Sequence, residues 1–283
     1  MKVTLISIVG LALFLIIFTG CMNMRRSTKK FQAEFKESEI EVNVVHDTFE
    51  NRTFRYLHYE RNPSLPTLIF VHGAPGSATS FSGYIKDTSL NQHFNLIVVD
   101  RFGYGYSDYG HHTSLNKQAG LLADLALTFA QKSKVFLIGH SFGGPIVARS
   151  AIQLGDQIAG SIMIAPAMDP ENEKYFPGGK LAYWKATRWI FSGAWRVSAS
   201  EKYRHADELK SIENDWNKLS TPLYHIHGTE DKLVPYVNLA FSTAHFQDSI
   251  LETYSWKEKG HLVPFTEKKT TINLIISFVN RHI

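Results

Sequence analysis

The stretch from Val135 to Ala151, VFLIGHSFGGPIVARSA, decides the fold. The four apolar residues Val135–Ile138 are typical of a strand that is covered on both faces, and the residues after Gly143 indicate a helix. Ser141 stands between them in the pattern Gly-His-Ser-Phe-Gly. Glycine on both sides lets the backbone turn sharply without a Cβ clash, so the pattern predicts a serine nucleophile on a tight turn. A passive serine in a glycine-rich turn is the alternative.

Strands and helices alternate on both sides of this stretch. Continuous apolar runs at 68–71 and 96–99 resemble the run before Ser141, and residues 121–130 between them and Ser141 have the composition of a buried helix. This alternation predicts a mostly parallel central sheet with helices on both faces. Further strands are expected at 158–165, 223–227 and 250–256, a helix at 271–279, and half-buried edge strands within 31–60.

Residues 169–220 interrupt the alternation and hold four of the five tryptophans among many charged residues. An aromatic helical insertion after the sixth strand predicts a small lid. Its rings either meet substrate or fasten the lid to the body, and for any single ring the second role is favoured. The expected domains are an N-terminal targeting segment (1–30), the first part of the core (31–168), the lid (169–220) and the second part of the core (221–283).

A serine hydroxyl barely ionises near neutral pH, so it needs a base and an acid that orients the base. Asp231 follows the strand at 223–227, and His261 follows the strand at 250–256. The order Ser, Asp, His along the chain is the order that a strand-turn-helix nucleophile requires. Glu230 is the rival acid. A turn-capping aspartate and a surface histidine are the alternative interpretations.

Two other features suggest a metal or a cofactor less strongly. His225 and His227 share one strand face, but no clustered carboxylate or cysteine completes a metal site, so we expect one or both to pack in the sheet. The glycine-rich segment Asp100–Ser107 lacks the order of a dinucleotide-binding loop. The sequence therefore predicts neither a metal nor a cofactor.

From about Phe54 to its end, the chain resembles α/β hydrolases of the lipase, esterase, haloperoxidase and C–C hydrolase branch. The resemblance rests on the serine turn, the acid and base loops, the segment Asp100–Ser107, and His72–Gly76 directly after the strand at 68–71. It implies an α/β-hydrolase fold. It also implies these roles: Ser141 as nucleophile, His261 as general base, Asp231 as orienting acid, and the amides of Ala74 and Phe142 as oxyanion donors.

The same resemblance implies a carboxylic ester hydrolase that works through an acyl-enzyme on a small molecule. The aromatic lid favours an apolar substrate. Ser141 argues against haloalkane dehalogenases and epoxide hydrolases, which use aspartate at this position. C–C bond hydrolases, lactonases and thioesterases share the constellation and stay open. A ligand-binding relative with little turnover is the alternative outside catalysis. The sequence leaves the oligomeric state open.

The N-terminus has the pattern of a membrane-targeting segment. No charge occurs between Lys2 and Arg25, and the apolar run ends in Phe-Thr-Gly-Cys at Cys21, which resembles the lipobox of bacterial lipoproteins. This predicts lipidation of Cys21 and a catalytic domain in the cell envelope, outside the cytoplasm. The uncharged run Val3–Met24 could instead span a bilayer uncleaved, or be an ordinary cleaved signal.

The charge distribution excludes one class of partner. The net charge of +4 arises before residue 31, where five basic residues occur without any acid, and the rest holds 25 basic against 26 acidic residues. A near-neutral body lacks the basic footprint that phosphate-backbone binding requires. The expected partners are therefore a small-molecule substrate and, through the N-terminus, a membrane, but no nucleic acid.

Overall fold

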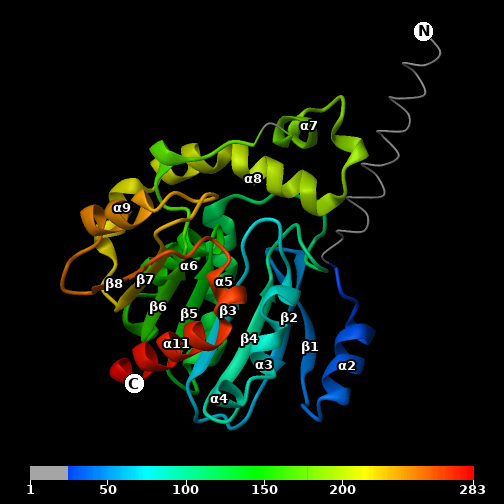
Figure 1. The fold of residues 1–283 in the computed structure, drawn as a ribbon. Coiled ribbons are helices and arrows are strands. Elements are labelled where there is room, and N and C mark those ends of the chain that lie inside the picture. Colours follow the sequence, from blue (N-terminus) through cyan, green and yellow to red (C-terminus); the bar gives the residue numbers. More distant parts are fainter. Residues whose placement is uncertain (1–24, 177) are drawn as a thin grey trace.

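The fold was analysed in a computed structural model that describes residues 25–176 and 178–283. Cys21 and the rest of the apolar N-terminal run lie outside the described residues. One eight-stranded sheet forms the centre, in the order β1-β2-β4-β3-β5-β6-β7-β8, and helices lie on both of its faces (Figure 1). The strands are β1 (Asn43–Phe49), β2 (Arg52–Tyr59), β3 (Thr67–Val71), β4 (Asn95–Asp100), β5 (Val135–His140), β6 (Gly160–Ile164), β7 (Leu223–Gly228) and β8 (Leu251–Trp256).

The sheet is parallel from β4 to β8 and antiparallel only at the edge formed by β1 and β2. The α-helices are α2 (Thr28–Glu37), α3 (Ser82–Ile85), α4 (Thr88–Asn91), α5 (Leu115–Ala130), α6 (Gly143–Leu154), α7 (Gly179–Tyr183), α8 (Gly193–Lys210), α9 (Val237–His245), α10 (Val263–Thr266) and α11 (Lys268–His282). This architecture confirms the predicted α/β-hydrolase fold class. Among the described residues, no helix is both long and apolar enough to cross a membrane.

The two faces of the sheet explain why its strands are continuously apolar. In β3, Ile69 and Val71 point into one core cluster with residues of α5 and α6, whereas Leu68 and Phe70 point into the other with residues of α2, α3 and α11. All four side chains are buried. Because both faces are covered by helices, apolar residues are required at consecutive positions.

Helix α2 was not predicted, and it runs across the domain boundary expected after residue 30. Its Phe31 and Phe35 lie one turn apart, are fully buried and stack with ring centres 6.3 Å apart. The Ser27 side chain caps the helix by accepting from the Lys30 amide. The surrounding residues are polar, and these two phenylalanines are the only buried residues of the helix.

The lid lies between β6 and β7 and consists of α7, α8 and the 3₁₀ turns η3 (Pro170–Asn172), η4 (Arg188–Ile190) and η5 (Glu213–Lys218). Figure 1 shows α8 crossing over the carboxyl ends of the parallel strands. His205 of α8 fastens this crossing, because its Nε2 lies 2.8 Å from the Ala167 carbonyl and its ring packs 4.5 Å from the ring of Phe142. The lid therefore covers the turn that carries Ser141.

Candidate active site

Ser141 lies at the tip of the turn between β5 and α6, with a backbone φ of 55°. This left-handed conformation is uncommon for a residue that carries a side chain and marks a strained turn. The flanking positions accept only glycine: a Cβ at Gly139 would lie 2.3 Å from the Gly143 carbonyl oxygen, and one at Gly143 would lie 2.5 Å from that of Val71. The partly exposed serine is thus held in one backbone conformation.

Asp231 lies on the turn after β7, where both of its carboxylate oxygens have partners. Oδ1 accepts from the amides of Leu233 and Val234, at 2.9 and 2.8 Å. Oδ2 lies 2.7 Å from Nδ1 of His261. The side chain of Glu230, the rival acid, is exposed. Asp231 is therefore the residue of the two that contacts the histidine.

The charge state of Asp231 suits a residue that orients a base. Burial alone would raise the pKa of Asp231, but hydrogen bonds from His227, His261 and the Val234 amide outweigh burial and hold this pKa well below its ordinary value. The ionised carboxylate keeps the proton of His261 on Nδ1. Nε2 of a neutral His261 is then free to accept a proton.

The acid and base loops are fixed to each other through their backbones. The Glu230 amide donates to the Lys259 carbonyl at 2.9 Å, and a Cβ at Gly228 would lie only 2.2 Å from that same oxygen. Glycine at position 228 therefore permits the close approach that brings the two loops together.

His140 connects the histidine loop to the serine turn. Nε2 of His140 lies 3.0 Å from the His261 carbonyl, and the ring centres are 4.8 Å apart. Burial, followed by the charge of His261, lowers the pKa of His140 to about 3, so this ring is neutral and donates through Nε2. Within the described residues, no hydrogen bond joins Ser141 Oγ directly to His261. Such bonds are often long before substrate binds.

Two backbone amides, one in the serine turn and one in the loop beside it, lack an acceptor among the described residues. A Cβ at Gly73 would lie 2.9 Å from the Ser141 Cβ, so the loop after β3 runs directly against the serine. In the part of the chain that the structure describes, neither the Ala74 amide nor the Phe142 amide donates a hydrogen bond. Free N–H groups at this position can stabilise a developing oxyanion.

A buried network that sequence reasoning missed holds the loop after β3. The Arg101 guanidinium donates to the carbonyls of His72 and Gly73, at 2.8 and 3.1 Å, and to Glu201 of α8, at 2.7 Å. Tyr104 also donates to Glu201. Arg101 and Tyr104 stand in the glycine-rich segment already noted, but their partner lies 100 residues away along the chain from Arg101.

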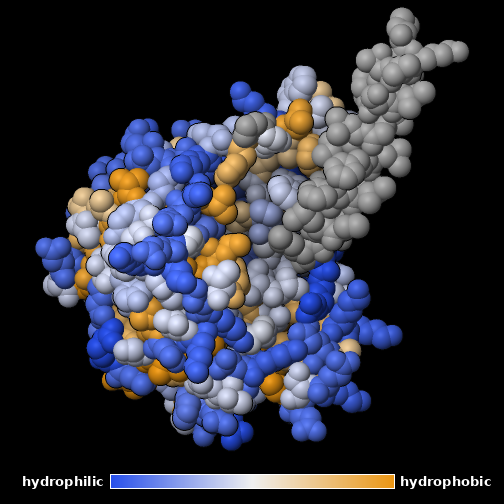
Figure 2. All heavy atoms as spheres, viewed as in Figure 1, coloured by the Kyte–Doolittle hydropathy of each residue, from blue (hydrophilic) through white to orange (hydrophobic). Residues whose placement is uncertain are grey.

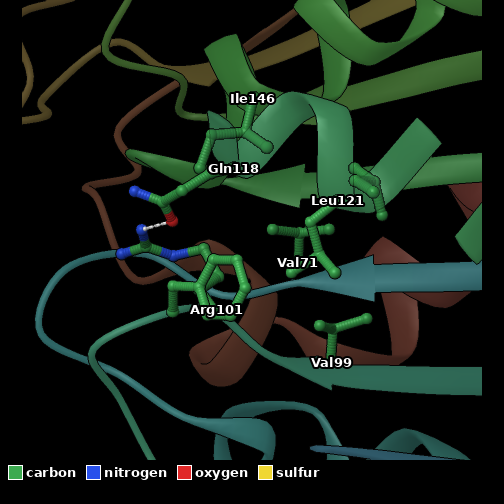
Figure 3. Close-up of a pocket in the computed structure, with 8 residues that line it drawn as sticks. Val71, Val99, Arg101, Gln118, Leu121 and Ile146 are labelled. Atoms are coloured by element: carbon green, nitrogen blue, oxygen red, sulfur yellow. Dashed lines mark hydrogen bonds between the residues drawn. The ribbon is translucent and has the colours of Figure 1, made fainter. Parts of the chain in front are cut away.

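Figure 3 shows the bond between Arg101 and Gln118 beside the apolar residues Val71, Val99, Leu121 and Ile146. These residues line a cavity of about 10 Å³, which is large enough for no more than a single water molecule. The cavity therefore belongs to the packing beneath the loop and cannot hold a substrate.

His225 and His227 are fully buried and support the acid. Nε2 of His227 lies 3.1 Å from the Val234 carbonyl and 3.4 Å from Asp231 Oδ2, both of them acceptors, so it carries the proton. Nδ1 of a neutral His227 then accepts from Nε2 of His225 at 3.0 Å, and His225 in turn accepts from Ser242. No group of three metal-ligating side chains occurs among the described residues.

A profile of the α/β-hydrolase family matches residues 68–269, which include the serine turn, both loops and the lid. The chain belongs to the α/β-hydrolase family. Membership also supports hydrolase activity.

Curated relatives of this family align over different lengths. The uncharacterized hydrolase YugF of Bacillus subtilis is 24% identical over 264 residues, which cover 79% of this chain and 93% of YugF. A pimeloyl-[acyl-carrier protein] methyl ester esterase of Vibrio vulnificus is 28% identical over 38% of this chain and 40% of its own. A probable 1-acylglycerol-3-phosphate O-acyltransferase of Oryza sativa subsp. japonica is 28% identical over 42% of this chain. The chain spans only 29% of that protein.

Solved structures share the fold at low sequence identity. A membrane phospholipase A aligns with a TM-score of 0.66 and 18% identity, covering 99% of this chain and 98% of its own. A putative aryl esterase from Burkholderia cenocepacia aligns with a TM-score of 0.68 and 18% identity, covering 85% of this chain and 99% of its own.

Proposed function

We propose that the chain is a serine hydrolase that cleaves a carboxylic ester of a small, apolar molecule through an acyl-enzyme. The observation that carries this proposal is the contact between Asp231 and His261, held by His140 beside a serine in a strained turn. Orienting acid, base and nucleophile are the three groups that acyl transfer requires. The relatives named as esterases support the choice of an ester.

In the first half of the proposed reaction, Ser141 Oγ attacks the ester carbonyl carbon while His261 Nε2 takes the hydroxyl proton. The amides of Ala74 and Phe142 stabilise the resulting oxyanion. The tetrahedral intermediate then expels the alcohol, which leaves with the proton from His261. The acyl group remains bound to Ser141.

In the second half, water attacks the acyl carbon while His261 again takes a proton. The second tetrahedral intermediate releases the carboxylic acid, and the proton returns to Ser141 Oγ. Asp231 stays ionised in both halves and stabilises the imidazolium that forms twice.

The test is turnover of p-nitrophenyl esters of increasing acyl length by the purified full chain in detergent, compared with Ser141→Ala. Ester turnover by the wild type alone supports the proposal. Parallel thioester and lactone substrates separate the alternatives that share the same groups. A folded wild-type protein that turns over none of them, or a variant as active as the wild type, contradicts it.

We also propose that the apolar N-terminal segment attaches the protein to a membrane, with Cys21 as its lipidation site and the catalytic domain in the cell envelope. Cys21→Ala should abolish acylation and release the protein from the membrane. A variant that stays membrane-bound would refute lipidation as the means of attachment and favour an uncleaved apolar anchor.

A further inference from the structure

The outer surface of the lid carries an unusual concentration of exposed apolar side chains. Trp184 and Trp189 are 62% and 66% exposed, which makes them the two most exposed large apolar residues in the part of the chain that the structure describes. With their exposed neighbours they form what we call the lid patch: Tyr175, Phe176, Leu181, Tyr183, Trp184 and Trp189. Figure 2 shows apolar residues along the lid at the top of the molecule. Large exposed apolar patches usually mark interaction sites.

The tryptophans of the patch are not used for packing. Trp216, at the end of the same insertion, is 0% exposed and packs against Phe246, as expected of a ring that fastens the lid to the body. The indole N–H of Trp189 instead donates to the Ala186 carbonyl at 3.0 Å while the ring stays exposed. Because its one polar atom is already bonded, Trp189 offers mainly apolar surface to a partner.

The segment that carries the patch has basic side chains only. Residues 174–192 contain four basic side chains and no acidic one, although the chain as a whole beyond residue 30 is nearly neutral. None of Lys180, Lys185 and Arg188 forms an ion pair with a side chain that the structure describes. Aromatic rings combined with unpaired basic residues match the interface of an anionic bilayer, where Trp and Tyr concentrate and Lys and Arg meet headgroups.

The apolar N-terminal run joins the body beside the lid. The Arg25 guanidinium lies 4.3 Å from the ring centre of Tyr106 and 4.0 Å from that of Tyr109. Tyr109 in turn packs against the first turn of α8, where its hydroxyl accepts from the Ala194 amide at 3.2 Å. Residue 25 is therefore fixed next to the start of the lid helix. The point at which residues 1–24 join the body is therefore on the lid side of the domain.

We propose that the lid patch docks on the anionic lipid surface of the membrane that holds the N-terminal segment. This inference rests on the membrane attachment proposed above. A second copy of the chain is a poorer occupant, because a two-fold contact through this patch would bring its unpaired basic residues against their own copies.

The test is tryptophan fluorescence of the full chain, reconstituted into vesicles of phosphatidylcholine and phosphatidylglycerol whose acyl chains carry bromine as a quencher. Residues 1–24 contain no tryptophan, so the anchor itself contributes no signal. We expect brominated lipid to quench the wild type. We expect quenching to be lost in the double variant Trp184→Phe/Trp189→Phe and kept in the matched control Trp256→Phe, which removes a buried ring.

The charge of the patch is tested in the same vesicles. Lys180→Glu/Lys185→Glu should lower the quenching when phosphatidylglycerol is present and change it little in phosphatidylcholine alone. Flotation of the vesicles separates the two proposals. A chain that floats but is not quenched overturns docking and leaves attachment intact, whereas a chain that does not float overturns both. Quenching that survives in the double tryptophan variant, or crosslinking of two lid patches to each other, also overturns docking.

Discussion

The carboxyl end of the sheet, which carries Ser141, and the lid above it are built in opposite ways. At the carboxyl end of the sheet, Asp231 and His261 are 6% and 9% exposed and bonded to each other, and glycines let the surrounding loops approach closely. On the lid, Trp184 and Trp189 are exposed, and the basic side chains between residues 174 and 192 form no ion pair with a side chain that the structure describes. One region thus fixes the geometry of the proposed catalytic groups while the other offers a surface, and the Arg101–Glu201 pair connects them.

The largest effect is expected from removing the proposed base at the carboxyl end of the sheet. His261→Ala should lower kcat for a p-nitrophenyl ester by about 10⁴–10⁶, because removing one member of a nucleophile-base-acid unit costs nearly as much as removing all of them. Stopped-flow and steady-state kinetics measure this loss, with circular dichroism as the control for folding. A loss below ten-fold would mean that another residue is the base.

Removing the Arg101–Glu201 pair, which connects the loop after β3 to the lid, should destabilise the fold. Glu201→Ala leaves the Arg101 guanidinium buried without its partner, which should lower the free energy of unfolding by about 3–5 kcal/mol in urea titrations. The matched control is Glu171→Ala, because Glu171 forms an exposed pair with Lys210 and its loss should change the stability little. Equal effects of the two substitutions would show that the buried pair does not hold the lid.

The acid should give the carboxyl end of the sheet a characteristic pH dependence. Because the pKa of Asp231 is held below its unfolded value of about 3.9, its ionised form stabilises the folded state above that pH, and the contribution is lost as the pH falls toward the folded pKa. Asp231→Asn should therefore lower the free energy of unfolding more at pH 6 than at pH 3. A difference between the two proteins that stays constant with pH would show that the folded structure does not lower this pKa.

A smaller effect is expected from the residue behind the acid. His227 is a positioning residue, since its contact is with Asp231 and not with substrate. His227→Phe keeps a ring but removes the N–H, so kcat should fall about ten-fold with little change in KM. The acidic limb of the kcat–pH profile should move to higher pH as well. His227→Gln should restore part of the rate, and no rescue would indicate a packing role only.

The smallest effect is expected from substitutions in the lid patch. Trp184→Phe/Trp189→Phe should leave turnover of a short, water-soluble ester within about two-fold of the wild type, because exposed substitutions away from a site rarely matter. Steady-state kinetics in detergent measures this. A large loss in kcat would place the patch in the catalytic machinery and remove the separation between the two regions.

The parts of the fold that could be predicted are those set by local chemistry. Four apolar residues before a Gly-x-Ser-x-Gly turn indicate a covered strand and a strained serine wherever they occur, because the residues forming the turn are neighbours in sequence. Asp231 and His261 were found because each follows a recognisable strand. Helix α2 was missed because it buries only Phe31 and Phe35, in an otherwise polar stretch. His227 was expected to pack in the sheet, but its contact with Asp231, like the role of Glu201, was missed because no local pattern encodes such contacts.

Activation of Ser141 as a nucleophile is measured with a fluorophosphonate probe on the full chain, followed by peptide mapping by mass spectrometry. We expect one modified peptide, with the label on Ser141, and no labelling of Ser141→Ala. Labelling should also be strongly slowed in His261→Ala, since the base is absent. A folded wild type that does not react would contradict the activation of Ser141 and favour a ligand-binding role for the fold. A label on another serine would assign the nucleophile to that serine instead.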